Sequence, residues 1–141
     1  MTIYNLGDSA ITAALTNEVI TEGTASNGQS QELISNLDEV TALTLFCNFT
    51  YGSGGTTCAV VVQTSLDGTN WIDIARFDFT TASAAKRCNL SGLTAVAIAA
   101  VAALASESVL DGILGDRLRA KVTSTGTYAG NTSVSVRACV R

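Results

Sequence analysis

The sequence predicts an all-β fold, an antiparallel β-sandwich of about eight strands, and three observations support this. The 141 residues include 19 Thr and a single Met, and β-branched side chains pack well on a pleated sheet but lose rotamer freedom in a helix. Apolar and polar residues alternate along several segments, as they do in half-buried strands. Turn residues separate these segments at short intervals, and the jelly roll is one version of such an architecture.

The chain divides into an N-terminal arm and one sandwich domain. Residues 1–28 are rich in Ser, Thr, Asn and Gly with scattered apolar side chains, which predicts an extended arm or an edge strand that leads into a loop at 26–28. Residues 29–141 have the length of a single ordinary domain. Within it, a short strand is expected over 31–37, before the first clear alternation begins at Leu43.

Alternating residues over 43–50 and 57–66 flank a glycine-rich turn, so we expect these segments to pair as a hairpin. In that register Cys47 faces Cys58, close enough for a disulfide. The alternative is two small buried thiols, which a reducing compartment favours. The four Cys include no CxxC pair and the chain has no His, so neither a metal site nor a cofactor is expected.

A second hairpin is expected at the Asp-Gly turn that precedes Trp71. It places Val60 opposite Phe77 and Leu66 opposite Trp71. The apolar residues change parity along the strand that begins at Trp71, and this change predicts a β-bulge near Ala75.

A third hairpin has the cleanest alternation. Apolar residues occupy every second position of 117–122 and of 133–138, and 124–131 forms the loop between them. The parity shared by the three hairpins predicts which side chains form the core. Its expected members are Leu45, Phe49, Val60, Val62, Trp71, Phe77, Leu118, Val122, Val134 and Val136.

The Ala-rich segment 93–110 fits the pattern least. Its Ala content favours one short helix, yet its larger apolar residues do not fall on one helical stripe, and an extended, tightly packed segment is the alternative. The uncharged stretch 93–105 is 13 residues long, against roughly 20 for a membrane span. The first ten residues do not resemble a secretory signal. We therefore expect a protein made in the cytoplasm, without a membrane partner.

The residue types do not favour an enzyme. Without His, neither a Ser–His–Asp triad nor a Cys–His pair can form. Asp73 and Asp78 are the nearest carboxylate couple that could hydrolyse a glycoside. Strand alternation places them on opposite faces unless the bulge intervenes, so no catalytic residue is assigned.

Charge is distributed unevenly along the chain. Eight acidic residues and no basic one precede Arg76, whereas eight basic and four acidic residues follow from there, so the net −4 divides into −8 and +4. The candidate partner interface is a basic ladder on one face of the last hairpin, formed by Arg117, Arg119, Lys121, Arg137 and Arg141. Like charges side by side destabilise a sheet, which favours an anionic partner across that face. The alternative is a solvated face with scattered salt bridges.

An acidic protein surface fits the basic ladder better than nucleic acid does. No aromatic residues are interleaved with the bases, and a pI near 4.5 gives overall repulsion from a polyanion. We expect a homo-oligomer, a dimer or a trimer, that attaches to such a surface. The arm, which has no basic residue, and the uncharged stretch 93–105 would add apolar contacts.

Several motifs resemble those of small virion proteins of tailed bacteriophages. They are TSLDGTNWIDIA at 64–75, FDF at 77–79, GDRLR at 115–119 and TSTGTY at 123–128. The likeness is to capsid cement (decoration) proteins with a jelly-roll sandwich, and it covers residues 40–92 and 113–140.

The resemblance implies a mechanical role on the outer surface of a virion, for a protein made in the host cytoplasm. Cement proteins bridge neighbouring major capsid proteins of the HK97-like type, usually as dimers or trimers, and resist the internal pressure of the DNA. The alternative is a carbohydrate-binding or tail-fibre module, which would need an exposed aromatic platform. Trp71 is the only Trp, and its expected position is in the core.

Overall fold

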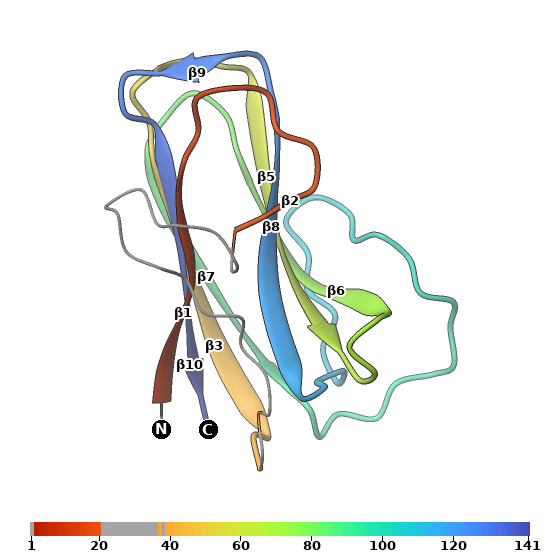
Figure 1. The fold of residues 1–141 in the computed structure, drawn as a ribbon. Coiled ribbons are helices and arrows are strands. Elements are labelled where there is room, and N and C mark those ends of the chain that lie inside the picture. Colours follow the sequence, from red (N-terminus) through yellow and green to blue (C-terminus); the bar gives the residue numbers. More distant parts are fainter. Residues whose placement is uncertain (1, 21–36, 38) are drawn as a thin grey trace.

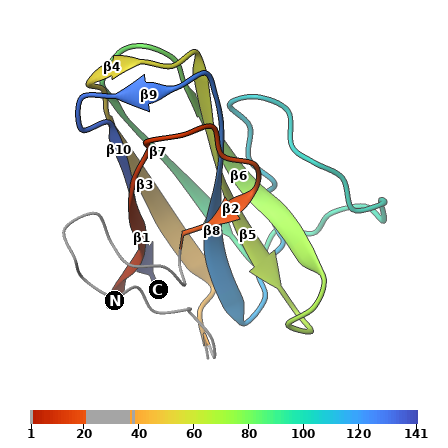
Figure 2. The same ribbon diagram turned by 45° about the horizontal axis from the view of Figure 1, so that its top comes forward.

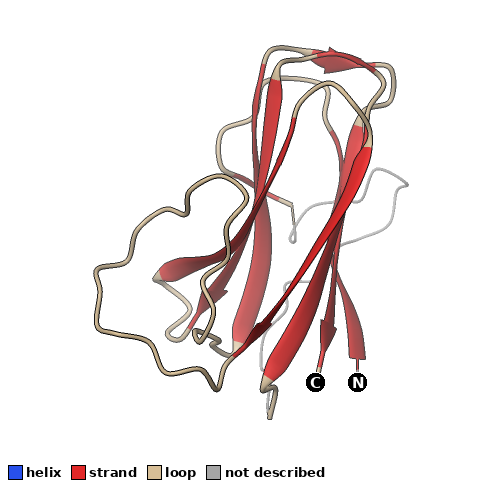
Figure 3. Cartoon of the chain, turned by 180° about the vertical axis from the view of Figure 1, so that it is seen from behind, coloured by secondary structure: helices blue, strands red, loops and turns tan. Residues whose placement is uncertain are grey.

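The computed structural model describes residues 2–20, 37 and 39–141, and these residues form strands and loops but no helix (Figure 3). The strands are β1 (Thr2–Ala10), β2 (Glu18–Val19), β3 (Ala42–Thr50), β4 (Ser53–Gly54), β5 (Thr57–Ser65), β6 (Trp71–Phe79), β7 (Ala84–Ser91), β8 (Arg117–Thr125), β9 (Tyr128–Ala129) and β10 (Ser133–Val140). The all-β expectation is confirmed. Residues 93–110 form a loop rather than a helix, and their large apolar side chains are mostly exposed rather than tightly packed.

Eight of the described strands form two four-stranded antiparallel sheets that pack face to face (Figures 1 and 2). Sheet A has the order β1-β10-β3-β7, and sheet B has the order β2-β8-β5-β6. The short strands β4 and β9 pair across one end of the sandwich. The core contains buried apolar side chains from both sheets, so the predicted β-sandwich is confirmed.

The strand alternation places the core as expected. Every second residue of β8 and of β10 is buried, because successive side chains of a strand point to opposite faces of its sheet. Nine of the ten expected core residues are buried; they are Leu45, Phe49, Val60, Val62, Phe77, Leu118, Val122, Val134 and Val136. Trp71 is the exception.

An aromatic cluster fills the end of the core beneath β4 and β9. Phe49 stacks on Phe79 with ring centroids 4.9 Å apart, and Tyr128 meets Phe49 edge-on at 5.8 Å. The Tyr128 hydroxyl donates a 2.7 Å hydrogen bond to the carbonyl of Thr80. The buried ring therefore keeps its polar atom satisfied.

The hairpin of β5 and β6 is confirmed, including its bulge. Val60 pairs with Phe77 as expected, and the register shifts by one residue farther along because β6 has an extra residue at Ile74. Beyond this bulge Trp71 pairs with Ser65 rather than with Leu66. The one-residue shift moves the Trp71 side chain to the outer face of sheet B, where it is half-buried.

The two other expected hairpins are wrong, because their strands lie in different sheets. β3 pairs with β10 and β7, and β5 pairs with β6 and β8. The connection 51–56 therefore crosses from sheet A to sheet B, and β8 likewise lies in sheet B while β10 lies in sheet A. Alternation shows which side chains of a strand face the core, but it does not show which strand lies beside it. Two strands that face each other across the core have the same alternation as two strands that pair in one sheet.

The two crossing connections pack backbone against backbone, and glycine makes this contact feasible. A Cβ on Gly52 would lie 1.9 Å from the carbonyl oxygen of Gly130. Gly55 has φ +69°, and a Cβ there would lie 2.3 Å from the ring of Tyr128. The glycine-rich segment is thus a close contact between two crossings instead of a hairpin turn.

Cys47 and Cys58 do not lie on adjacent strands, contrary to the prediction, because β3 and β5 belong to different sheets. Both are free and buried. Burial, with a contribution from the nearby Cys58, raises the pKa of the Cys47 thiol, and burial followed by the charge of Asp78 raises the pKa of Cys58 to about 12. At neutral pH both are therefore protonated and poorly nucleophilic.

The N-terminal region supplies edge strands. β1 pairs with β10 at the edge of sheet A, and β2 pairs with β8 at the edge of sheet B. Of the two predictions for the N-terminal region, an extended arm or an edge strand, the edge strand is confirmed for 2–10 and 18–19. The expected loop at 26–28 and most of the expected strand at 31–37 lie outside the described residues, and Leu37 is buried but belongs to no strand.

Val134→Asp should abolish folding, because it places an unpaired carboxylate at a core position that is 1% exposed. The measurement is thermal unfolding followed by circular dichroism, and we expect no cooperative transition. Ser133→Asp is the matched control, since the preceding side chain on β10 points away from the core. A Val134→Asp protein that stays soluble with the melting temperature of the native chain would contradict this register.

Four free thiols should be counted when the denatured, unreduced chain is titrated with a thiol reagent, because all four cysteines are free. In the folded protein at about pH 8, Cys47 and Cys58 should react only as fast as the chain opens, since neither thiolate forms readily. A count below four would show that a bridge forms in solution.

Candidate interaction surfaces

The structure divides the five expected interface bases between two opposite faces. Arg117, Arg119 and Lys121 alternate along β8 and project from the outer face of sheet B. Arg137 projects from the outer face of sheet A, and Arg141 follows at the end of β10. The prediction of a ladder on one face is therefore wrong, for the same reason that the β8–β10 hairpin is wrong. We call Arg117, Arg119 and Lys121 the basic row.

Arg119 makes the most contacts with other side chains of the basic row's sheet. Its Nε donates a 2.8 Å hydrogen bond to Gln63 Oε1, and Gln63 Nε2 donates a 2.6 Å bond to Asp73 Oδ1. Its guanidinium lies over the ring of Trp71, 4.0 Å from the centroid. Stacking and hydrogen bonding together hold this side chain flat on the outer face of sheet B.

The other two members of the basic row are less constrained. Arg117 Nε lies 3.3 Å from Asp116 Oδ1, in an ion pair between two partly exposed side chains. The Lys121 ammonium has no ion-pair or hydrogen-bond partner among the described residues. Lys121 and Arg76 flank Val61 from the two neighbouring strands. The outer face of sheet B therefore has positive charge available to a partner.

Arg137 on sheet A is already engaged. Its Nη1 lies 2.9 Å from Asp8 Oδ1 and its Nη2 lies 3.0 Å from Asp8 Oδ2, and Nη1 also donates to Asn5 Oδ1. Burial alone would raise the pKa of Asp8, but hydrogen bonds from Arg137 and Ser135 outweigh burial and hold that pKa below its usual value. Arg137 thus secures the edge strand β1 to β10.

The Ser-Leu-Asp-Gly-Thr-Asn-Trp motif forms the turn between β5 and β6. Asp67 Oδ1 accepts hydrogen bonds from the backbone N–H groups of Thr69 and Asn70, and the Gly68 N–H donates to Ser65 Oγ. The hydrogen bonds from the backbone and side chain of Asn70, together with the one from the Thr69 N–H, hold the pKa of Asp67 below its usual range. The Asp and Ser of the motif therefore shape a turn.

The long connection 92–116 lies outside the sandwich beside β6, where Figures 1 and 3 show it as a wide loop. We call its uncharged stretch 93–105 the apolar segment. Its exposed large side chains are Leu93, Val96, Ile98 and Val101. Soluble proteins rarely leave so many neighbouring apolar side chains in water unless they meet a partner.

The residues that follow the apolar segment fasten the loop to the edge of sheet B. Val109 forms an antiparallel bridge with Ala75, next to the bulge. The backbone bonds of this bridge run from Arg76 N–H to Ser108 O and from Leu110 N–H to Ile74 O. The bulge at Ile74 therefore lies where the loop joins the edge of sheet B.

Charged side chains fasten the same part of the loop. Arg76 Nη1 donates to Leu104 O at 3.1 Å, and the Leu104 N–H lies 3.4 Å from Asp73 Oδ2. Arg76 also pairs with Asp78, and Lys86 pairs with Glu107. The bulge has brought Asp73 and Asp78 to one face, and there Asp73 accepts a hydrogen bond from the Leu104 N–H and Asp78 accepts one from the Ser106 hydroxyl.

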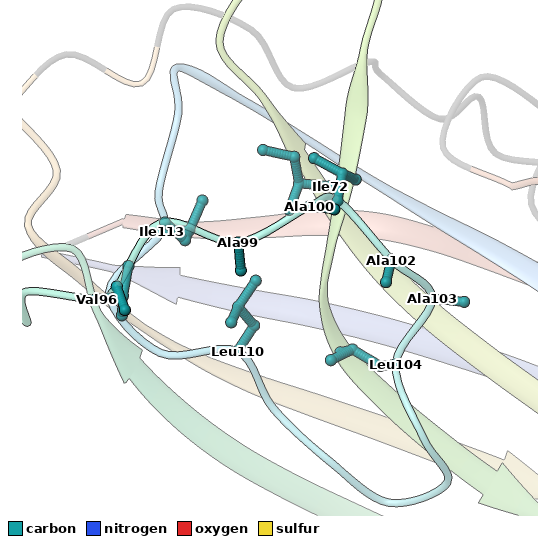
Figure 4. A pocket seen from close by; sticks show the side chains of 11 residues that line it. Ile72, Val96, Ala99, Ala100, Ala102, Ala103, Leu104, Leu110 and Ile113 are labelled. Carbon is teal, nitrogen blue, oxygen red and sulfur yellow. The ribbon is translucent and has the colours of Figure 1, made fainter.

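A hollow of about 290 Å³ lies between the apolar segment and the start of β6 (Figure 4). Ile72, Leu110 and Ile113 form one wall, and the opposite wall is the apolar segment with its small Ala side chains. The described residues contain no group of three potential metal ligands. Within 2–20, 37 and 39–141, no helix is long and apolar enough to cross a membrane.

Asp8→Asn should destabilise the fold by about 1–2 kcal/mol at pH 7, because it removes one charge of a half-buried pair. The folded pKa of Asp8 lies below the unfolded one. The pair therefore contributes fully above about pH 4 and loses its contribution as the pH falls through the folded pKa. Urea unfolding across the acid range should show a flatter pH dependence for Asp8→Asn than for the native chain. Asp116→Asn, at the more exposed ion pair with Arg117, should leave the profile nearly unchanged, and equal profiles for all three proteins would contradict this role of Asp8.

Comparison with known proteins identifies no relative. No family model, curated protein or solved structure matches the chain. Two surfaces of the molecule are candidate interaction sites, the basic row of β8 and the apolar segment beside β6.

Proposed function

We propose that this chain is a structural virion protein, a cement protein on the outside of a phage capsid that bridges and stabilises neighbouring major capsid proteins. Its role is binding rather than catalysis. The outer face of sheet B attaches to an acidic surface of an HK97-like shell, and the chain acts as a dimer or a trimer. The sequence motifs at 64–79 and 115–128 resemble those of such proteins, and two structural observations support the proposal.

The strand order supports a jelly roll, the sandwich expected for these proteins. Along the chain, β1, β3, β7 and β10 belong to sheet A, whereas β2, β5, β6 and β8 belong to sheet B. Only the step from β5 to β6 stays within one sheet, and every other step between these eight strands crosses the core. We infer that the chain is wound as two Greek keys into a jelly roll.

The observation that carries the proposal is the composition of the outer face of sheet B. Arg119 and Trp71 form a stacked pair there, Lys121 has no ionic partner among the described residues, and the apolar segment borders the same sheet at β6. Protein interfaces are enriched in Arg and aromatic residues. Basic residues beside an apolar surface fit a partner that is acidic and partly apolar.

Many weak contacts would be sufficient for this role. Each copy that touches two neighbouring capsid subunits holds them together, and many copies around a shell multiply the effect without a strong individual interface. Charges set the association rate and its salt dependence, and apolar contacts set the lifetime of the complex. Both kinds of contact are present beside each other on this chain.

A carbohydrate-binding or tail-fibre module is the second candidate, and the position of Trp71 favours it. The side chain lies on the outer face of sheet B, where an aromatic platform for a sugar would be. One face of the ring is covered by the Arg119 guanidinium at 4.0 Å. Quenching of Trp71 fluorescence by oligosaccharides would support this candidate over the cement protein.

Arg117→Ser/Lys121→Ser should weaken attachment to shells assembled from the major capsid protein encoded in the same genome. We expect a loss of about 2- to 30-fold at low ionic strength, because two exposed ion pairs are removed. The dependence of attachment on salt should also become shallower. The measurement is co-sedimentation of the protein with shells over a range of salt concentrations.

The matched control is Arg87→Ser/Arg141→Ser, which removes the same charge from the opposite sheet. Its attachment should equal that of the native chain after correction for net charge. If both variants lose attachment equally, the basic row is not the binding surface and its side chains are simply exposed to solvent. No attachment of the native chain to shells would overturn the cement proposal.

A further inference from the structure

An exposed aromatic ring lies in the middle of the outer face of sheet A. Phe46 is 44% exposed, and it points away from the core because its neighbours Leu45 and Cys47 are buried. Its partners across the sheet are Arg137 on β10 and Arg87 on β7. Among the described residues, no aromatic ring or cation stacks on Phe46. Its ring is therefore available to a ligand.

The polar side chains around this ring have hydrogen-bonding capacity to spare. Asn48, Arg87 and Asn89 are exposed on the same face. None of these three side chains has a hydrogen-bond or ion-pair partner among the described residues. Thr44 and Ser135 add hydroxyls in the neighbouring rows of the sheet. The face thus offers amide, hydroxyl and guanidinium groups around one aromatic ring.

Charge on this face is positive and sparse. Arg137 and Arg87 flank the ring, and the Arg141 side chain makes one 3.4 Å hydrogen bond to Thr44 Oγ1. Asp8 is the only acidic residue in the four strands of sheet A, and Arg137 already binds it. A ligand on these strands therefore meets spare positive charge and no free carboxylate.

We propose that the outer face of sheet A binds an acidic oligosaccharide, with Phe46 as the platform for one sugar ring and Arg87 as the partner of a carboxylate. The apolar face of a sugar ring packs on an aromatic side chain. Sugar hydroxyls both donate and accept hydrogen bonds, and so do the free amides of Asn48 and Asn89. The planar guanidinium of an arginine can bind a carboxylate through two parallel hydrogen bonds.

The composition of the face favours a sugar over the other anionic partners. A nucleic-acid strand carries a phosphate on every nucleotide, and proteins bind it with many bases and several aromatic rings. The outer face of sheet A has one aromatic ring, and the chain as a whole has a net charge of −4. The centre of a protein interface is mostly apolar, whereas Phe46 is surrounded by polar side chains. An oligosaccharide with few carboxylates matches both properties.

This site lies opposite the surface proposed for the shell. The outer faces of the two sheets point away from each other across the core (Figures 1 and 2). A chain that attaches through sheet B therefore leaves sheet A facing outward. The inference goes beyond the proposed function and uses it only for this direction. The site is also separate from Trp71, whose ring is covered on one face by Arg119.

The test is isothermal titration calorimetry of the full chain with two acidic probes, a hexamer of galacturonic acid and sialyllactose. At low ionic strength we expect binding of at least one probe with a Kd of about 1 mM or below. Trp71 fluorescence should stay unchanged, since that side chain lies on the far sheet. A native chain that binds neither probe would overturn the proposal. Tighter binding of a single-stranded oligonucleotide, or quenching of Trp71 by the probe, would do the same.

Substitutions on the face separate the ring from the charge. Phe46→Leu keeps apolar bulk without the ring, so affinity should fall at least about tenfold, whereas Phe46→Tyr should bind like the native chain. Arg87→Ser should weaken binding of the acidic probe about three- to tenfold. Arg117→Ser, the same change on the opposite sheet, is the matched control and should have no effect. Melting temperatures near that of the native chain would show that the variants fold, and unchanged binding by Phe46→Leu or Arg87→Ser would contradict this site.

Attachment to shells separates this inference from the proposed function. Phe46→Leu should attach to shells like the native chain, because sheet A faces away from them. A native chain that binds the acidic probe but not shells would keep the sugar site and refute the cement role. A chain that attaches to shells but binds neither probe would keep the cement role and refute the sugar site.

Discussion

The extra residue that β6 carries at Ile74 determines what the outer face of sheet B presents. Without it, Trp71 would follow the parity of Phe77 into the core, and Asp73 would not share a face with Asp78. With it, Trp71 stacks under Arg119, and Asp73 reaches both Gln63 and the backbone of Leu104. The network of the basic row and the fastening of the loop both depend on this one irregularity in a regular sheet.

Local patterns in the sequence predicted the core well because burial is a property of each strand by itself. The parity of Val134 and Val136 is the same whatever strand lies beside them. Strand pairing depends instead on whether the connection between two strands stays in one sheet or crosses to the other. The only hairpin predicted correctly has a short turn in which Asp67 accepts backbone hydrogen bonds. At 51–56 and 126–132 glycine has another use, since it allows two crossings to touch at Gly52 and Gly130.

The candidate site was predictable only in part, for the same reason. Alternation correctly placed Arg119 and Arg137 on outer faces, but it could not tell that these faces belong to different sheets. The uncharged stretch was visible in the sequence as an apolar run, whereas its conformation was not. Ala-rich residues favour a helix in isolation, whereas here they form a loop that is attached to sheet B at Leu104 by Arg76 and farther along by the bridge at Val109. These tertiary contacts have no local signature.

The two surfaces of this sandwich differ in how they can bind. The basic row consists of long side chains, and binding through them costs side-chain entropy except at Arg119, which the Trp71 ring and Gln63 already hold in place. The apolar segment is fastened at its C-terminal end, where Asp73 and Arg76 bind the backbone of Leu104, and the Lys86–Glu107 pair holds the residues that follow it. Less ordering is therefore needed at this end of the segment when a partner binds. An apolar surface that is attached to the sheet at one end, beside a row of long charged side chains, allows fast encounter and slow release to be adjusted by different residues, which is what the proposed attachment of many copies to one shell needs.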